Sequence, residues 1–159
     1  MKKVLLIIMC LFLLCGCGNK EEEKKTISIN MSKVSEKLSN VTIDGKNPFS
    51  NKENINDLDL IKGYSVDVDL FDEYVIYLSS SVEDPSMYMV LKPKKDKESV
   101  VKYQINDMYK EYLAAYQGYY PEAVPTIENR LEKEEGDYLI YVVSKDNNSV
   151  YNKIMECKD

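Results

Sequence analysis

Histidine is absent from the 159-residue sequence, and arginine occurs once, as Arg130. Without an imidazole the chain has no Ser-His or Cys-His nucleophile, no histidine ligand for a metal ion and no histidine acid or base. The phosphate-binding patterns G-x-G-x-x-G and G-x-x-x-x-G-K-[ST] are also missing. These absences exclude most hydrolase mechanisms and the common phosphate-binding loops, and we expect no cofactor.

Cysteine is scarce and unevenly placed, with Cys10, Cys15 and Cys17 near the start of the chain and Cys157 near its end. The first residues, MKKVLLIIMCLFLLCGCGN, combine two lysines, an apolar run at 4–14 and small residues. As a helix, this run of eleven residues is roughly 16 Å long, about half the hydrocarbon core of a bilayer. It is therefore too short to span a membrane and is typical of a secretory signal peptide.

Leu14-Cys15-Gly16-Cys17 resembles the lipobox of bacterial lipoproteins. The resemblance implies that residues 1–16 are a signal peptide, that cleavage follows Gly16 and that Cys17 receives a diacylglyceryl group. Two acyl chains give a stable anchor where one gives a reversible one. We therefore expect a lipid anchor on the extracytoplasmic face of the cell membrane. The alternative is an ordinary signal peptide whose cysteines have no role.

The mature chain is acidic, since removal of residues 1–16 leaves 19 basic and 27 acidic residues. This balance argues against nucleic acid and anionic lipid as partners, because both favour clustered basic side chains. The preference for lysine, asparagine and isoleucine suggests an AT-rich genome, as in low-GC Gram-positive bacteria. Residues 17–25 are expected to form a charged tether, and residues 26–159 a single monomeric domain.

Cys157 is the only thiol that remains after processing, which excludes an intramolecular disulfide. Val150, Ile154 and Cys157 share one helical face, so Cys157 is better interpreted as a buried apolar residue than as a reactive thiol.

Hydrophobic periodicity predicts an alternation of helices and hairpins. Val34, Leu38 and Val41 mark a short helix capped by Asn30 or Ser32, and Ile55, Leu58 and Ile61 mark another, closed by Gly63 in a left-handed conformation. The remaining elements are strands at 73–80 and 87–93, a helix at 99–119, strands at 128–134 and 138–144, and a helix at 148–157.

The order of these elements indicates an α+β fold with an antiparallel sheet of about four strands and helices packed on one face. Shifted by 50 residues, Tyr88, Lys95, Asp96, Ser99 and Val100 coincide with Tyr138, Lys145, Asp146, Ser149 and Val150. A duplicated β-β-α unit is one explanation, and chance identity is the other.

Carboxylates are concentrated in SVDVDLFDE, where Asp67, Asp69 and Asp72 are candidate cation ligands. Apolar residues alternate with these acids, which favours a strand with one solvated face. The segment also lacks the glycine and the distal glutamate of an EF-hand loop. We therefore predict no metal site and keep these three residues as weak candidates.

Thirteen tyrosines make a binding surface a reasonable hypothesis. Five of them follow one side of the long helix and its exit: Tyr109, Tyr112, Tyr116, Tyr119 and Tyr120. We take Tyr109, Tyr116 and Tyr120 as the candidate surface for a glycan or a partner protein. In the alternative, Tyr112 and Tyr119 face the core and the other rings are half-buried around it.

From about residue 56 onward, several short motifs occur in a characteristic order. They are Tyr64-Ser65-Val66-Asp67, VIYLS from Val75, Tyr119-Tyr120-Pro121, and Gly136-Asp137-Tyr138-Leu139-Ile140 before Val142-Val143-Ser144. In these the chain resembles the domain-of-unknown-function family 4358, small lipoproteins largely from Firmicutes. The acidic residue common before the apolar run of the second strand is not found at Met87 or Tyr88. The resemblance implies a lipoprotein and no particular mechanism.

Together these features favour a non-catalytic binding or adaptor module for an envelope protein or cell-wall component. One alternative is an enzyme that cleaves cell-wall glycan with two carboxylates about 5 to 9 Å apart. The other is a cation-binding protein.

Overall fold

The computed structural model describes residues 26–50, 63–79 and 81–159. The signal peptide, the tether and the helix predicted at 55–61 lie outside these residues. The described elements are α2 (Met31–Leu38), the 3-10 turn η2 (Val68–Leu70), β1 (Phe71–Leu78), β2 (Met87–Pro93), α4 (Glu98–Tyr119), the 3-10 turn η3 (Pro121–Ala123), α5 (Val124–Glu128), β3 (Leu131–Glu135), β4 (Tyr138–Val143) and α6 (Asn147–Met155). None of the described helices is long and apolar enough to cross a membrane.

The four strands form one antiparallel sheet in the order β1-β2-β4-β3. Two hairpins, β1–β2 and β3–β4, join through the central pair, in which Met89 lies opposite Tyr141 and Leu91 opposite Leu139. Gly136 makes the β3–β4 turn with a φ of 59°, a conformation that suits glycine. The predicted α+β class and four-stranded antiparallel sheet are confirmed.

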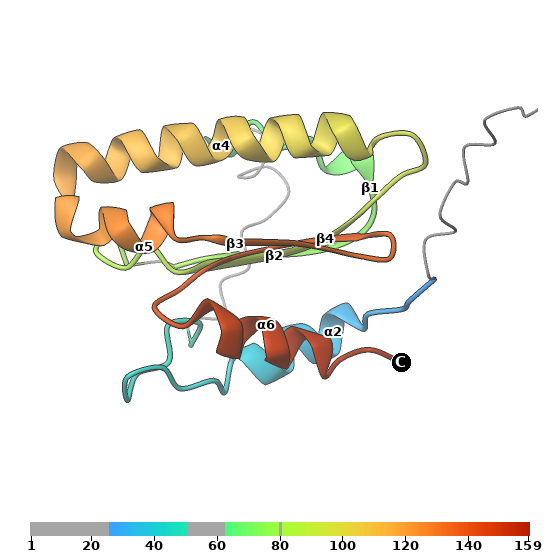
Figure 1. Cartoon of the computed structure of the whole chain (residues 1–159), viewed down its shortest axis with the longest axis horizontal. Coiled ribbons are helices and arrows are strands. Elements are labelled where there is room, and N and C mark those ends of the chain that lie inside the picture. The colour runs from blue at the N-terminus through green and yellow to red at the C-terminus, as the bar shows by residue number, and fades with distance from the viewer. Residues whose placement is uncertain (1–25, 51–62, 80) are drawn as a thin grey trace, which may run out of the picture.

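Helices cover both faces of the sheet, so the prediction that they pack on one face is wrong. Figure 1 shows α4 and α5 on one side of the strands and α2 and α6 on the other. The reason lies in the central strands: every residue of β4 is buried, as is each residue from Met87 to Leu91 in β2. A strand that is apolar on both faces needs a covering layer on each.

Two clusters of buried side chains make up the core, one on each side of the sheet. Under α4, the helix residues Val101, Ile105 and Met108 recur at three- and four-residue spacing and pack on the sheet. On the other face, Val34 and Leu38 of α2 and Val150 and Ile154 of α6 pack on the even-numbered residues of β2 and β4. Cys157 is buried in this second cluster, as predicted.

The proposed duplication of a β-β-α unit agrees with the strands of the sheet but not with the helices. In a 50-residue repeat, Met89 corresponds to Leu139 and Leu91 corresponds to Tyr141. Because Met89 pairs with Tyr141 and Leu91 pairs with Leu139, the central strands agree with a two-fold relation between the two halves. The two-fold axis of an antiparallel strand pair is perpendicular to the sheet and leaves a helix on its original face. Because α4 and α6 lie on opposite faces, the duplicated β-β-α unit is wrong for the helices.

The first and last described segments lie side by side. Asn30 donates its backbone N–H to the carbonyl of Cys157 at 3.0 Å, and Asp159 donates to the carbonyl of Ser28 at 3.1 Å. A salt bridge of 2.8 Å between Lys37 and Glu156 also joins α2 to the end of α6. In Figure 1, this paired end of the domain lies opposite the C-terminal end of α4.

The backbone and hydrogen bonds at the helix ends can be compared with the two caps predicted from the sequence. Asn30, one of the two predicted caps of α2, accepts a hydrogen bond from the backbone N–H of Lys33 at 3.0 Å. Gly63 has helical backbone and is not left-handed, so its predicted role as a left-handed cap is wrong.

Candidate ligand-binding pocket

The three aspartates of the acidic segment are exposed, as the alternation predicted, but only residues 71–73 of the segment lie in a strand, β1. Val68–Leu70 form a 3-10 turn, and the Asp67 carboxylate accepts from the backbone N–H of Asp69 at 3.0 Å. A short acidic side chain that bonds the local backbone competes with strand formation. Within the described ranges, no three metal-ligating side chains come together, and this holds for Asp67, Asp69 and Asp72.

Two carboxylates line a cleft of about 340 Å³ beside Tyr109, between α4 and the β3–β4 hairpin. Glu132 pairs with Arg130 at 2.5 Å, and Glu134 pairs with Lys102 at 2.6 Å. A glycosidase needs two carboxyl groups that are free to act on the substrate, whereas both of these are engaged in salt bridges. This cleft therefore gives no support to a glycan-cleaving pair.

Tyr109, a predicted member of the binding surface, lies in the core with 2% of its surface exposed. Its ring is covered by the Arg130 guanidinium, 4.5 Å from the ring centroid. Burial raises the pKa of the Tyr109 phenol. Its hydroxyl has no hydrogen-bond partner among the residues that the structure describes. Tyr109 follows Ile105 by four residues and shares its buried stripe, so its side chain cannot belong to an exposed binding surface.

Replacing Tyr109 with phenylalanine should stabilise the protein, because the substitution removes a buried hydroxyl without a partner and keeps the ring under Arg130. An unsatisfied buried hydroxyl costs about 1 to 3 kcal/mol. We expect Tyr109→Phe to raise the free energy of unfolding by about 1 kcal/mol, measured by chemical denaturation.

Tyr138→Phe is the matched control for this substitution. The buried Tyr138 hydroxyl accepts from the backbone N–H of Ile29 at 3.3 Å and donates to Glu73 at 3.5 Å. Its loss should lower the free energy of unfolding by about 1 kcal/mol. A similar loss in Tyr109→Phe would contradict the assignment of an unpartnered hydroxyl.

A second hollow lies at the C-terminal end of α4 and is lined by tyrosines. Its volume is about 380 Å³. The tyrosines that line it are Tyr64, Tyr112, Tyr116, Tyr119 and Tyr120. Three of them belong to α4, Tyr120 follows the last turn, and Tyr64 comes from the segment before η2. We call this hollow the tyrosine pocket.

The rings of the tyrosine pocket contact one another at an angle. The centroids of Tyr112 and Tyr116 are 4.8 Å apart with the rings inclined at 51°, and those of Tyr116 and Tyr120 are 5.9 Å apart at 52°. The Tyr112 hydroxyl donates to the Tyr116 hydroxyl at 3.3 Å, which donates to the backbone carbonyl of Asp84 at 3.2 Å. This chain of hydrogen bonds connects the helix to the loop between β1 and β2.

Two phenols of the tyrosine pocket, those of Tyr112 and Tyr116, are held in their neutral form. Burial is the main cause that raises the pKa of Tyr112 and of Tyr116, and the negative charge of Asp84 raises both further. The two hydroxyls therefore remain hydrogen-bond donors at physiological pH, and neither supplies a phenolate base.

Exposure varies from the floor of the tyrosine pocket to its rim. Tyr116 is 7% exposed, Tyr112 and Tyr120 are half-buried, and Tyr119 is 81% exposed. The alternative that Tyr119 faces the core is thus wrong. Sequence reasoning did not find Tyr64, because it lies 48 residues before Tyr112 and no local pattern connects the two.

The pocket lies within a domain that comparison with known families identifies. The family model described as Domain of unknown function (DUF4358) matches residues 46–144. The chain belongs to this family. The matched range of the DUF4358 domain includes all four strands, α4 and the tyrosine pocket, whereas α2 and α6 fall outside it. No curated protein and no solved structure matches the chain. The resemblance to this family is therefore confirmed, and the lipoprotein prediction stays untested.

Proposed function

We propose that this DUF4358 protein is a monomeric lipoprotein, anchored through Cys17 on the extracytoplasmic face of the membrane, that binds an envelope protein or cell-wall component without catalysis. The tyrosine pocket carries the binding part of the proposal. The signal peptide and lipobox in the sequence carry the anchoring part.

Several features of the pocket suit it to recognition. Tyrosine rings supply a large contact area with few rotatable bonds, and tyrosine is enriched where binding energy is concentrated. The contacts of Tyr116 with Tyr112, Tyr120 and the Asp84 carbonyl fix its ring before any ligand arrives. A preorganised site loses less conformational entropy when it binds.

Photo-crosslinking in intact cells tests this proposal. A benzophenone amino acid placed at Tyr119, on the rim of the pocket, should give a discrete adduct. The same amino acid at Tyr103 is the control, because Tyr103 is 67% exposed on the same helix but does not line the pocket. Sixteen helical residues separate the two positions, or about 24 Å.

The second part of the crosslinking experiment fills the pocket with a larger side chain. Ala114 and Ala115 are exposed neighbours on α4, and of the two only Ala115 lines the pocket. With the crosslinker at Tyr119, Ala115→Trp should suppress the adduct, and Ala114→Trp should leave it unchanged. Equal adducts from Tyr119 and Tyr103, or no effect of Ala115→Trp, would contradict binding through this pocket.

A further inference from the structure

We infer that the tyrosine pocket accepts a cation with an alkylated ammonium group. This inference rests on the proposed binding function and assigns a ligand class to the same site. It is drawn from the aromatic lining, the charges around the pocket and the hydrogen bonds already made by its hydroxyls.

The lining of the pocket suits both the positive charge and the apolar alkyl groups of such a ligand. The faces of aromatic rings attract a cation through their quadrupole, and inclined rings can surround it from several sides. The Tyr116 ring is inclined to that of Tyr112 and to that of Tyr120, and all three line the pocket. The alkyl groups on the nitrogen are apolar, and they would meet the apolar side chains of Leu78, Val82 and Met108, which complete the wall.

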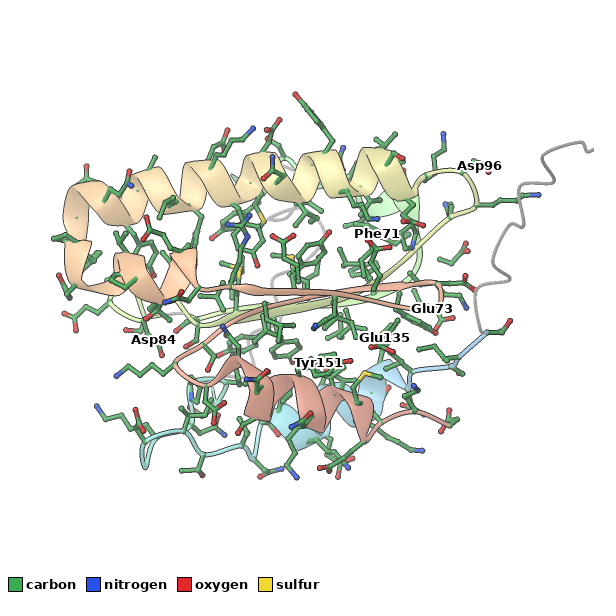
Figure 2. All side chains as sticks on the ribbon, in the orientation of Figure 1. Phe71, Glu73, Asp84, Asp96, Glu135 and Tyr151 are labelled. Carbon is green, nitrogen blue, oxygen red and sulfur yellow. The ribbon has the colours of Figure 1, made fainter. Side chains whose placement is uncertain are left out.

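The charges around the pocket have the sign that a cation requires. Among the residues that the structure describes, those that line it include one acid, Glu111, and neither lysine nor arginine. Asp84 is close enough to raise the pKa of two of the pocket phenols. Figure 2 shows Asp84 at the end of the sheet near α5, away from Glu73, Glu135 and Asp96. The last turn of α4 also contains no basic residue to offset the negative end of the helix dipole.

Other ligand classes fit this arrangement less well. Among the lining residues in the described part of the chain, an anion would find no cationic side chain. A sugar needs many hydrogen-bond partners, and two hydroxyls of the lining, those of Tyr112 and Tyr116, already donate within the protein. Tyrosine rings make up much of the lining, and the faces of such rings attract a cation.

Comparison of choline with its neutral carbon isostere, 3,3-dimethyl-1-butanol, isolates the contribution of the charge. The full lipidated chain in a maltoside detergent, which has no ammonium group, would be titrated with each and followed by NMR. We expect choline to bind at least about tenfold more tightly than the isostere. Equal affinities, or binding of the isostere alone, would overturn the inference.

Substitutions locate the binding event. Tyr119→Ser and Glu111→Gln change an exposed tyrosine and an exposed acid that line the pocket, so both variants should fold while choline affinity falls by about three- to tenfold. Tyr103→Ser, at another exposed position of α4, should bind choline as the original protein does. An unchanged affinity in both pocket variants would overturn the inference.

Two further binding measurements, with chitotriose and with lipid vesicles, distinguish the alternative ligands. If chitotriose binds and choline does not, the ligand class is wrong and the proposed binding function stands. If neither binds, the ligand class is overturned, and the crosslinking experiment decides the binding function by itself. If choline binds, vesicles of phosphatidylcholine against vesicles of phosphatidylglycerol show whether the pocket also accepts a lipid headgroup or only a soluble amine; either result retains the ammonium assignment.

Discussion

Replacing Cys17 with serine should move the protein from the membrane fraction into the soluble fraction or the medium. The substitution removes the sulfur that would carry the diacylglyceryl group. Each buried methylene contributes about 0.8 kcal/mol to membrane affinity, so loss of two acyl chains removes nearly all of it. We expect the membrane-bound share to fall by at least about tenfold, measured by fractionation and by incorporation of labelled palmitate.

Cys10→Ser is the control for this experiment. It makes the same chemical change in the apolar run of the predicted signal peptide and should leave both anchoring and labelling intact. Retention of Cys17→Ser at the membrane, or labelling that persists in it, would contradict the lipobox interpretation. The protein would then be held at the membrane by other contacts or exported with an ordinary signal peptide.

Ile140→Ala should be among the most destabilising single substitutions in the domain. Ile140 is fully buried in β4, next to β2 in the sheet, and belongs to the cluster under α2 and α6. Truncating a buried isoleucine removes transfer free energy and leaves a cavity, at a cost of about 2 to 5 kcal/mol. Chemical denaturation of the purified protein should show a loss of this size in the free energy of unfolding.

This substitution also tests the second helical layer. If α2 and α6 did not cover that face, Ile140 would be exposed to water and its truncation would cost little. Val100→Ala provides the reference, because Val100 is 45% exposed and its change should cost less than about 0.5 kcal/mol. Similar costs for the two variants would contradict the two-layer arrangement.

The strands and the long helix were predictable because each has a strong local pattern. The strand predicted at 87–93 matches β2, and the helix predicted at 99–119 differs from α4 by one residue. The prediction that the helices cover one face of the sheet was wrong, although the sequence of β4 contains the pattern of a strand with both faces covered. In β4, YLIYVV has no polar residue, and a strand without alternation is buried on both faces.

The tyrosines were only partly predictable, because helical spacing does not show where the supporting sheet ends. Tyr109 continues the stripe of Ile105 and Met108, which accounts for its burial. Tyr119 would be expected to share the surroundings of Tyr112, seven residues earlier. However, α4 has 22 residues and is about 33 Å long, whereas the six residues of β4 cover about 20 Å. Figure 1 shows that the C-terminal end of α4 extends past the strands, and Tyr119 in this last turn is exposed.

If the chain is anchored through Cys17, the pairing of the two ends of the described domain bears on how it faces the membrane. Ser28 and Asp159 lie together at the end opposite the last turn of α4, so a tether from Cys17 would hold the domain by the end away from the tyrosine pocket. The nine residues 17–25 extend to about 30 Å at most, and the length of α4 adds about 33 Å. An upright domain would thus present its pocket toward the cell wall, up to about 60 Å above the lipid. A reporter fused after Asp159 would sit on the membrane side and leave the pocket free.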